Sequence, residues 1–180
     1  MCIRDSLSIM KINSKLDEGP VCNKYPLDIL ENENAKSLAD RLSNLAAEKI
    51  LTNIENILQQ KANFEEQDSS MATYAKKIQK IEGKINWNNE ADEILAKING
   101  LYPQPGAWFS FENDRHKILR ATLSKTTMRP GEIIDDELTI SCGNKSITVT
   151  EIQREAKKPQ KTRDFLLGSK LKKGIILKNE

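Results

Sequence analysis

The spacing of hydrophobic residues predicts one long helix in the first part of the chain. Apolar side chains recur at steps of three and four between positions 35 and 58, as they do along one face of an amphipathic helix. Asn32 or Asn34 is placed to cap its first turn. So broad an apolar stripe must be buried against something. Either a partner chain covers it or the chain lacks an N-terminal part of its sheet, and we favour the missing part.

Two strands are predicted before this helix. Residues 7–12 alternate weakly, and residues 21–29 form a second run in which Pro26 favours an edge position. A Gly-Pro pair at Gly19 marks a turn between them. Two short strands are too small to cover the helix. Residues 59–70 are polar and predict a surface connection.

Short strands separated by turns dominate the rest of the chain. A helix predicted at residues 89–101 ends before Pro103 and Pro105. The strands are predicted at 107–111, 117–124, 132–134, 138–142 and 146–153, and a short helix or turn at 162–168. Strands at this spacing with glycine turns predict a small barrel of the OB type. Such barrels often bind nucleic acid, although that link from fold to function is an analogy.

Charge divides the chain in the same way. Residues 1–70 carry 8 basic and 12 acidic residues, whereas residues 71–180 carry 20 basic and 14 acidic ones. A basic half beside an acidic half suggests a polyanionic partner for the basic half. An ordinary solvated surface explains so modest an excess equally well.

The stretch from residue 73 to residue 87 joins the two halves. Its isoleucines keep a rough helical spacing, and it contains Lys76, Lys77, Lys80 and Lys84. Further basic residues follow in the strand-rich half at Arg129, Arg154, Lys157, Lys158 and Lys161. Together they can contact the phosphates of an RNA, which gives affinity but no sequence identity. The alternative for each of them is a solvated face.

Several classes of function find no support in the composition. No apolar run approaches the length of a membrane span, and no secretory signal is recognisable. Cys2, Cys22 and Cys142 share no ligand spacing, which predicts free thiols in a reducing cytoplasm. With His116 as the single histidine, no histidine-based metal site is expected.

The ordered motifs of the chain resemble the methionyl-tRNA formyltransferase family. Four of them belong to its C-terminal half: Thr73-Tyr74-Ala75-Lys76-Lys77-Ile78, Ile85-Asn86-Trp87, Pro103-Gln104-Pro105-Gly106-Ala107-Trp108 and Phe165-Leu166-Leu167-Gly168. Two resemble the end of the catalytic domain: Ser8-Ile9-Met10 and Leu16-Asp17-Glu18-Gly19. The resemblance runs from about residue 7 to the C-terminus, and the first six residues fit no part of it.

The resemblance implies transfer of a formyl group from 10-formyltetrahydrofolate to the amino group of methionyl initiator tRNA. It makes Asp17 a catalytic carboxylate that orients and charges a histidine, and it assigns Leu16, Glu18 and Gly19 to folate binding. The family's Asn-x-His pair belongs upstream of residue 7, and His116 lies in the wrong half to replace it. We therefore expect an N-terminally truncated chain that is inactive alone. A turn aspartate that satisfies its own backbone is the alternative for Asp17.

The expected fold is α+β. It combines a remnant of a Rossmann-like formyltransferase domain at residues 1–62, a linker at 63–88 and an OB-like tRNA-binding domain at 89–180. The expected partner is initiator methionyl-tRNA, with no membrane and no metal, in a protein that is monomeric when full-length. Trp87 and Trp108 either stack on bases or, as we favour, pack the barrel. The alternatives for function are a non-catalytic RNA-binding module and a related folate-dependent formyltransferase acting on a sugar nucleotide or on folate.

Overall fold

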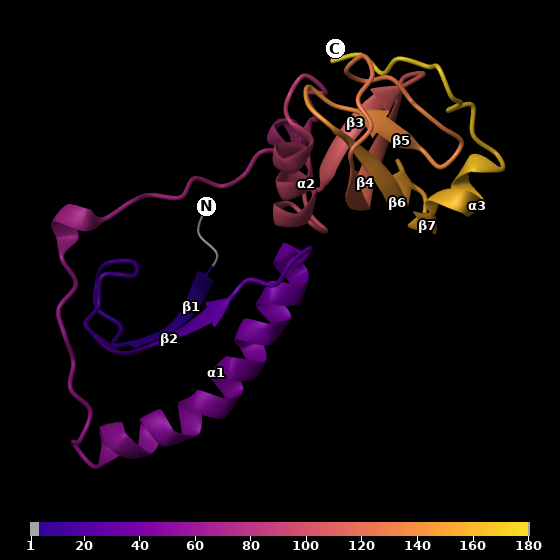
Figure 1. Ribbon diagram of the computed structural model, residues 1–180. Coiled ribbons are helices and arrows are strands. Elements are labelled where there is room, and N and C mark those ends of the chain that lie inside the picture. Colours follow the sequence, from indigo (N-terminus) through magenta and orange to yellow (C-terminus); the bar gives the residue numbers. More distant parts are fainter. Residues whose placement is uncertain (1–3, 180) are drawn as a thin grey trace. The chain divides into compact units, whose positions relative to one another are not determined.

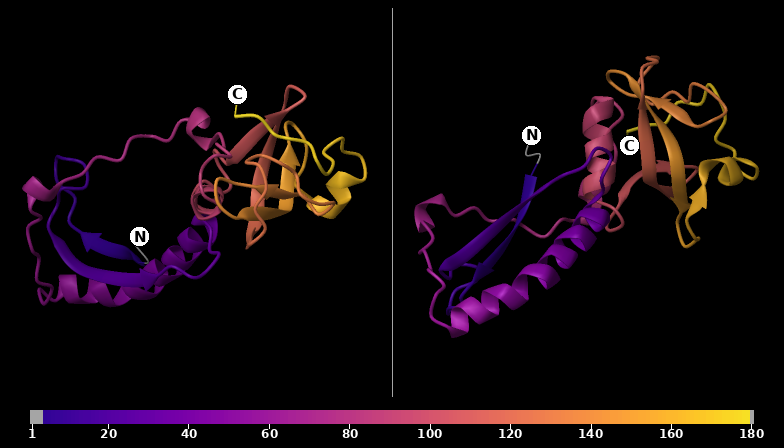
Figure 2. Two further views of the ribbon diagram at one scale, coloured as in Figure 1. Left: turned by 45° about the horizontal axis from the view of Figure 1, so that its top comes forward. Right: turned by 60° about the horizontal axis from the view of Figure 1, so that its bottom comes forward.

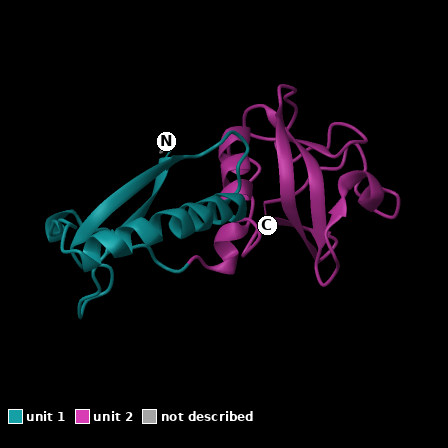
Figure 3. Ribbon diagram, turned by 90° about the horizontal axis from the view of Figure 1, so that it is seen from below, with its two compact units in different colours: residues 1–77 teal, residues 78–180 magenta. Residues whose placement is uncertain are grey.

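The computed structural model describes residues 4–179 and divides the chain into two compact units (Figures 1 and 3). The first unit covers residues 1–77 and the second covers residues 78–180. The division falls inside the range 63–88 that we predicted as a linker. Mixed helix and sheet agree with the α+β class that the sequence predicted.

A hairpin and one long helix make up the first unit. Strand β1 (Arg4–Met10) pairs antiparallel with β2 (Val21–Asp28), with a shift of register between Ile9 and Met10. Helix α1 (Ala35–Leu58) has the bounds that its apolar period predicted. Asn34 is the cap: its side chain accepts from the Ser37 backbone N–H, and the Ser37 side chain accepts from the Asn34 backbone in return. The helix is therefore confirmed with its bounds, and the strands predicted at 7–12 and 21–29 are confirmed with shifted ends.

Helix α1 buries little of its apolar stripe. Its one fully buried side chain is Asn53, whose amide donates to the Tyr25 hydroxyl of β2 at 2.8 Å and accepts from Asn23 at 2.6 Å. Five apolar side chains of its second half are exposed: Ile50, Leu51, Ile54, Ile57 and Leu58. The two strands do not cover the helix, as its sequence led us to expect.

The chain between the helix and the second unit is mostly extended. Glu65 forms an antiparallel bridge with Val21, with N–H to oxygen distances of 2.9 and 3.0 Å. After a single 3₁₀ turn, η1 (Ser69–Met71), residues 72–79 contain no helix. The helical spacing of Ile78, Ile81 and Ile85 was misleading here, because only a 3₁₀ turn, η2 (Lys80–Gly83), forms among them.

A curled antiparallel sheet and two helices form the second unit (Figure 2). Its elements are α2 (Ala91–Gly100), β3 (Ala107–Phe111), β4 (Asp114–Ser124), β5 (Thr139–Ser141), β6 (Ser146–Arg154), β7 (Gln160–Lys161) and α3 (Thr162–Leu166). The strands follow the order β3-β4-β6-β5, and β7 pairs with β6. The predicted strands at 107–111, 117–124, 138–142 and 146–153 are confirmed with shifted ends. The predicted strand at 132–134 is reduced to isolated bridges, and β7 was not predicted.

Short bridges extend this sheet at both edges. Ile133 bridges Ile140 of β5, and Glu132 in turn bridges Ile176. At the other edge the Ile85 N–H donates to the Trp108 carbonyl at 2.8 Å. The two extended edges meet where the Trp87 N–H donates to Asn179 Oδ1 at 2.8 Å. The sheet therefore wraps around one core.

Trp87 belongs to that core, whereas Trp108 is buried outside it, beside the η2 turn. Trp87 is 1% exposed and lies edge-on to Phe109 with ring centroids 5.8 Å apart, whereas Trp108 is 6% exposed. The prediction that they pack the second unit is confirmed. Cys142 is buried, which raises the pKa of its thiol to about 11. Cys22 and Cys142 are free, as predicted, and Cys2 lies outside the described residues.

An aromatic cluster surrounds the single histidine. His116 is buried and stacks on Phe109 at 5.4 Å, with Phe165 edge-on at 5.7 Å. Burial lowers the pKa of the imidazole, although a contact of Nδ1 with the Asp114 carbonyl at 3.2 Å opposes the shift. The role of the histidine in the second unit is therefore packing of this aromatic cluster.

The second unit should lose stability below about pH 6.5, the ordinary pKa of histidine. The folded state holds His116 neutral while the unfolded chain binds a proton, so acid favours unfolding. The contribution of neutral His116 to the free energy of unfolding is fully present above the pKa of the unfolded chain. It is lost as pH falls toward the lowered pKa of the folded state. Urea unfolding between pH 7.5 and 5 measures it. His116→Phe should flatten this slope, and an unchanged slope in the variant would assign it to other groups.

Candidate functional site

The predicted catalytic carboxylate lies on a fixed loop between β1 and β2. Asp17 has a φ of 56° and is exposed. The Gln67 side chain holds the loop, because its amide donates to the Asp17 carbonyl at 2.9 Å and to the Gly19 carbonyl at 2.7 Å. Both bonds involve backbone carbonyls, and neither involves the Asp17 carboxylate. It is available to a ligand, whereas the backbone beneath it is fixed.

Gly19 is required for the shape of this loop. A Cβ at this position would lie 1.7 Å from the Lys11 carbonyl oxygen. At the same close approach of the two segments, the Lys11 N–H donates to the Pro20 carbonyl at 3.0 Å. Glu18 forms an ion pair with Lys15 at 2.9 Å. The role of Gly19 in the structure is therefore close approach of two backbone segments.

A groove of about 930 Å³ opens beside Asp17 in the first unit. Leu16, Asp17 and Glu18 form one wall, and residues 65–75 contribute to the lining as well. The groove contains more acidic than basic side chains, and Tyr74 at its rim is 89% exposed. It has the volume of a site for a small organic molecule. Its acidic lining offers hydrogen-bond acceptors rather than a phosphate site.

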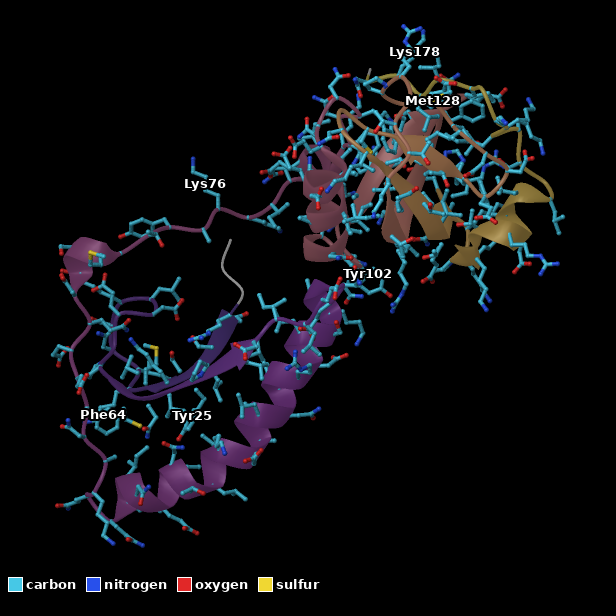
Figure 4. All side chains as sticks on the ribbon, in the orientation of Figure 1. Tyr25, Phe64, Lys76, Tyr102, Met128 and Lys178 are labelled. Carbon is cyan, nitrogen blue, oxygen red and sulfur yellow. The ribbon has the colours of Figure 1, made fainter. Side chains whose placement is uncertain are left out.

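The predicted basic residues fall into separate groups. Lys76 and Lys77 lie on the exposed extended segment of the first unit, where Figure 4 shows Lys76 projecting from the chain. Lys80 and Lys84 lie at the η2 turn of the second unit. Arg129 is exposed on the turn before Gly131, and it lines neither the groove beside Asp17 nor the two basic pockets of the second unit.

A basic pocket of about 370 Å³ lies in the second unit. Its charged and aromatic lining consists of Lys80, Trp108, Arg115, Lys117, Arg154 and Glu155, and we refer to it as the β4 pocket. The sequence prediction contained Lys80 and Arg154 but missed Arg115 and Lys117. A signal for them exists: on a strand, residues two apart share a face, so these two lie opposite the buried His116.

A second basic hollow, of about 360 Å³, lies near α3. Arg154, Lys157 and Lys158 line it together with Asp164 and Phe165. Lys161 is exposed at the end of β7, directly before α3. Arg154 is bound to Asp114, with Nε to Oδ2 at 2.8 Å, which leaves its charge partly neutralised. The structure thus brings most of the predicted cations of residues 154–161 to one end of β6 and β7.

Two further properties of the described residues concern metals and membranes. Among residues 4–179, no three histidine, cysteine or acidic side chains converge as a metal site would require. No helix in the same range combines the length and apolar character needed to cross a membrane.

Comparison with known sequences gives a consistent picture. The domain family described as Formyl transferase, C-terminal domain, matches residues 77–170. The methionyl-tRNA formyltransferase of Pelagibacter ubique strain HTCC1062 is 52% identical over 174 residues, covering 96% of this chain and 56% of that protein. The enzyme of the same name from Bradyrhizobium diazoefficiens is 40% identical, covering 92% of this chain and 55% of that protein. The chain spans about half the length of the curated relatives it matches.

Solved structures show the same fold at low sequence identity. HypX from Aquifex aeolicus in complex with tetrahydrofolic acid has a TM-score of 0.75 at 14% identity, covering 96% of this chain and 32% of its own. The methionyl-tRNA formyltransferase from Clostridium thermocellum has a TM-score of 0.55 at 20% identity, covering 66% and 51%. An N-formyltransferase from Helicobacter canadensis in complex with folinic acid and dTDP-3-aminofucose has a TM-score of 0.64 at 21% identity, covering 82% and 56%.

Proposed function

The chain belongs to the formyl transferase family, and from this premise we propose that it forms part of a cytoplasmic methionyl-tRNA formyltransferase. In this reaction a formyl group passes from 10-formyltetrahydrofolate to the amino group of methionine on initiator tRNA. The observation that carries the proposal is the 52% identity to the Pelagibacter ubique enzyme across nearly the whole chain.

The second unit suits the role of a tRNA-binding domain. Its β4 pocket gathers Lys80, Arg115 and Lys117 on one face, and Lys157 and Lys158 lie exposed at the end of the same sheet. Phosphate oxygens are hydrogen-bond acceptors, and lysine and arginine provide donors with positive charge. Lys76 and Lys77 add two cations on the segment that leads to this unit. We propose that these groups bind the phosphates of the tRNA.

We infer more detailed fold assignments for both units from their topology. The sheet order β3-β4-β6-β5 and the contact between Trp87 and Asn179 at its extended edges support an OB-like barrel. The hairpin β1-β2 and the uncovered helix α1 support the end of a Rossmann-like open sheet. This assignment gives the exposed apolar residues of α1 a partner in the remainder of that domain.

The groove beside Asp17 fits one wall of a site for the folate co-substrate. A reduced pterin carries ring N–H groups, and the carboxylates of Asp17 and Glu18 are acceptors for such donors. Leu16 is 89% exposed and offers apolar surface on the same wall. The co-substrate supplies the formyl carbon when it is bound. Gly19 contributes by holding the loop shape that presents these three side chains.

Asp17 would assist proton transfer during the reaction. The methionine amine must attack as a neutral group and then lose a proton. In the family pattern the aspartate orients and charges a histidine, which the described residues of this chain do not supply at the groove. A carboxylate on a fixed loop can hold such an imidazole in one orientation, as in a hydrolase triad. Asp17 is then a positioning residue whose charge supports proton transfer.

A chimera tests the proposal and the role of Asp17 together. Residues 4–180 are joined to the part of the Pelagibacter ubique relative that this chain does not span, and transfer of formyl to methionyl initiator tRNA is assayed. We expect activity in the chimera and a fall in kcat of about a thousandfold in Asp17→Asn, because proton handling is lost. Asp40→Asn, on the exposed face of α1, is the matched control. Retained activity in Asp17→Asn would contradict its role, and transfer to a dTDP-amino sugar instead of tRNA would contradict the proposed substrate.

A further inference from the structure

The walls of the β4 pocket are built from tightly packed backbone. The Trp108 indole N–H donates to the Lys80 carbonyl at 2.8 Å, which fixes the η2 turn against β3. A Cβ on Gly83 would lie 2.3 Å from the Gly106 carbonyl, so the turn and the strand are in close contact. Gly106, with a φ of 82°, lies over the aliphatic stem of Lys117. A pocket bounded this way keeps its shape before any ligand arrives.

Three of the four cations in its lining have no acidic partner among the described residues. Within residues 4–179, no ion pair engages Lys80, Arg115 or Lys117. Arg154 is paired with Asp114, and Glu155 is the acidic residue of the lining. The Glu155 backbone N–H donates to the Arg115 carbonyl at 2.9 Å. The pocket therefore has a clear excess of positive charge.

Arg115 is held in place by an aromatic ring. Its guanidinium carbon lies 4.2 Å from the centroid of the Trp108 ring, and Lys84 Nζ lies 5.8 Å from the same centroid. Stacking fixes the plane of the guanidinium and the directions of its five N–H donors. Because cations occupy the indole, a nucleobase is not expected to stack there.

One donor of Arg115 has no partner. Its Nε atom is buried from solvent, and no described residue accepts a hydrogen bond from it. Leaving a buried donor on a charged group unsatisfied is costly, so its presence calls for an explanation. The terminal nitrogens of the same guanidinium are not buried in this way, so their N–H groups are the donors that an acceptor entering the pocket can reach.

We propose that the β4 pocket binds one phosphodiester group of the RNA backbone and that Arg115 is the residue that recognises it. The inference rests on the proposed function, since RNA supplies the phosphodiester. Arginine and lysine side chains offer donors and no acceptors, so the ligand must be an anion with acceptor oxygens. A phosphate oxygen pair matches the fork of a guanidinium. Exposed Lys76 and Lys157 attract RNA at many positions, whereas a fixed pocket sets its register.

The ligand chemistry is testable on the whole 180-residue chain. The chain is labelled with ¹⁵N, and the Arg115 Nε–H resonance is identified by its loss in Arg115→Lys. Dimethyl phosphate, a diester that carries one negative charge and no second charge of a terminal phosphate, should shift this resonance in a saturable way. Sodium chloride at the same ionic strength should not. A shift that follows ionic strength alone, or no shift with dimethyl phosphate, would overturn the pocket as a diester site.

The RNA ligand is tested by affinity. Arg115→Gln should weaken binding of methionyl initiator tRNA about tenfold and reduce the salt slope by about one. Arg163→Gln is the matched control, because Arg163 is an exposed arginine of α3 outside the pocket and loses the same charge. Thermal unfolding of both variants checks that Arg115→Gln folds, and Lys117→Gln gives a second variant of the same pocket.

The outcomes separate this inference from the proposed function. If tRNA binds and the Arg115 and Lys117 variants match the Arg163 control, the inference fails and the proposed function stands. If dimethyl phosphate shifts Arg115 but tRNA does not bind, the proposed function fails and the pocket remains a phosphodiester site. A loss of affinity confined to the pocket variants supports both.

Discussion

Reversal of charge at Lys76, Lys77 and Lys80 to glutamate should weaken binding of methionyl initiator tRNA about a hundredfold at moderate salt. The slope of log affinity against log salt concentration should fall by about two to three, since each lost phosphate contact removes one counterion release. The expectation follows from the position of these residues on an exposed extended segment and an adjoining turn. Filter binding of the 180-residue chain from about 50 to 200 mM salt measures both quantities.

The three substitutions are not expected to disturb folding. All three residues are exposed, and the Trp108 indole binds the Lys80 carbonyl rather than its side chain. A charge reversal of equal size at Lys170, Lys172 and Lys173 is the matched control. An equal loss of affinity in the control would show that net charge alone determines binding, and an unchanged salt slope in the first variant would remove these lysines from the interface.

Substitution of Trp87 by alanine should lower the free energy of unfolding of the second unit by about 3–5 kcal/mol. Trp87 is 1% exposed and packs edge-on against Phe109, so its removal leaves a large cavity. It also lies where the two extended edges of the sheet meet, through its N–H and Asn179 Oδ1. Urea unfolding followed by far-ultraviolet circular dichroism measures the loss.

Tyr74→Ala provides the comparison for Trp87→Ala. Tyr74 is 89% exposed on the extended segment, and its truncation should change stability by less than about 0.5 kcal/mol. Both residues fall within the range we first assigned to a linker, 63–88. Equal and small effects of the two substitutions would contradict the packing of Trp87 in the second unit.

Regular periods explain which elements were predictable. Helix α1 keeps a period of three to four over 24 residues, and its cap is an asparagine with a serine three positions later. Strand β3 carries a compact aromatic run between a Gly turn and a polar turn. Both were found with their bounds. The local pattern was sufficient here because the apolar period, the cap and the flanking turns all lie within or beside the element itself.

Where tertiary contacts replace local preference, the sequence pattern failed. The isoleucines at positions 78, 81 and 85 have a helical spacing, but Ile85 is drawn into the core by the bond from its N–H to Trp108, and Ile81 stays 65% exposed. Strand β7 has two residues and depends on pairing with β6. Neither contact leaves a signal in the residues themselves.

The candidate sites show the same difference between local sequence patterns and tertiary contacts. Asp17 was predicted from the motif around it, and the structure adds the Gln67 side chain that holds its loop. No local pattern connects Gln67 with Asp17, because 50 residues separate them. Arg115 and Lys117 were missed because the predicted strand began at residue 117, whereas β4 begins at Asp114, so the alternation around His116 was not included in the prediction.

The salt dependence of tRNA binding by the unaltered chain tests the central proposal most directly. The affinity of the 180-residue chain for methionyl initiator tRNA is measured across a series of salt concentrations, with dTDP-amino sugar as a competitor. The account predicts saturable binding with a salt slope steeper than about three, and no competition by the sugar nucleotide. Absence of saturable binding at low salt, or a slope of about one or less, would contradict it.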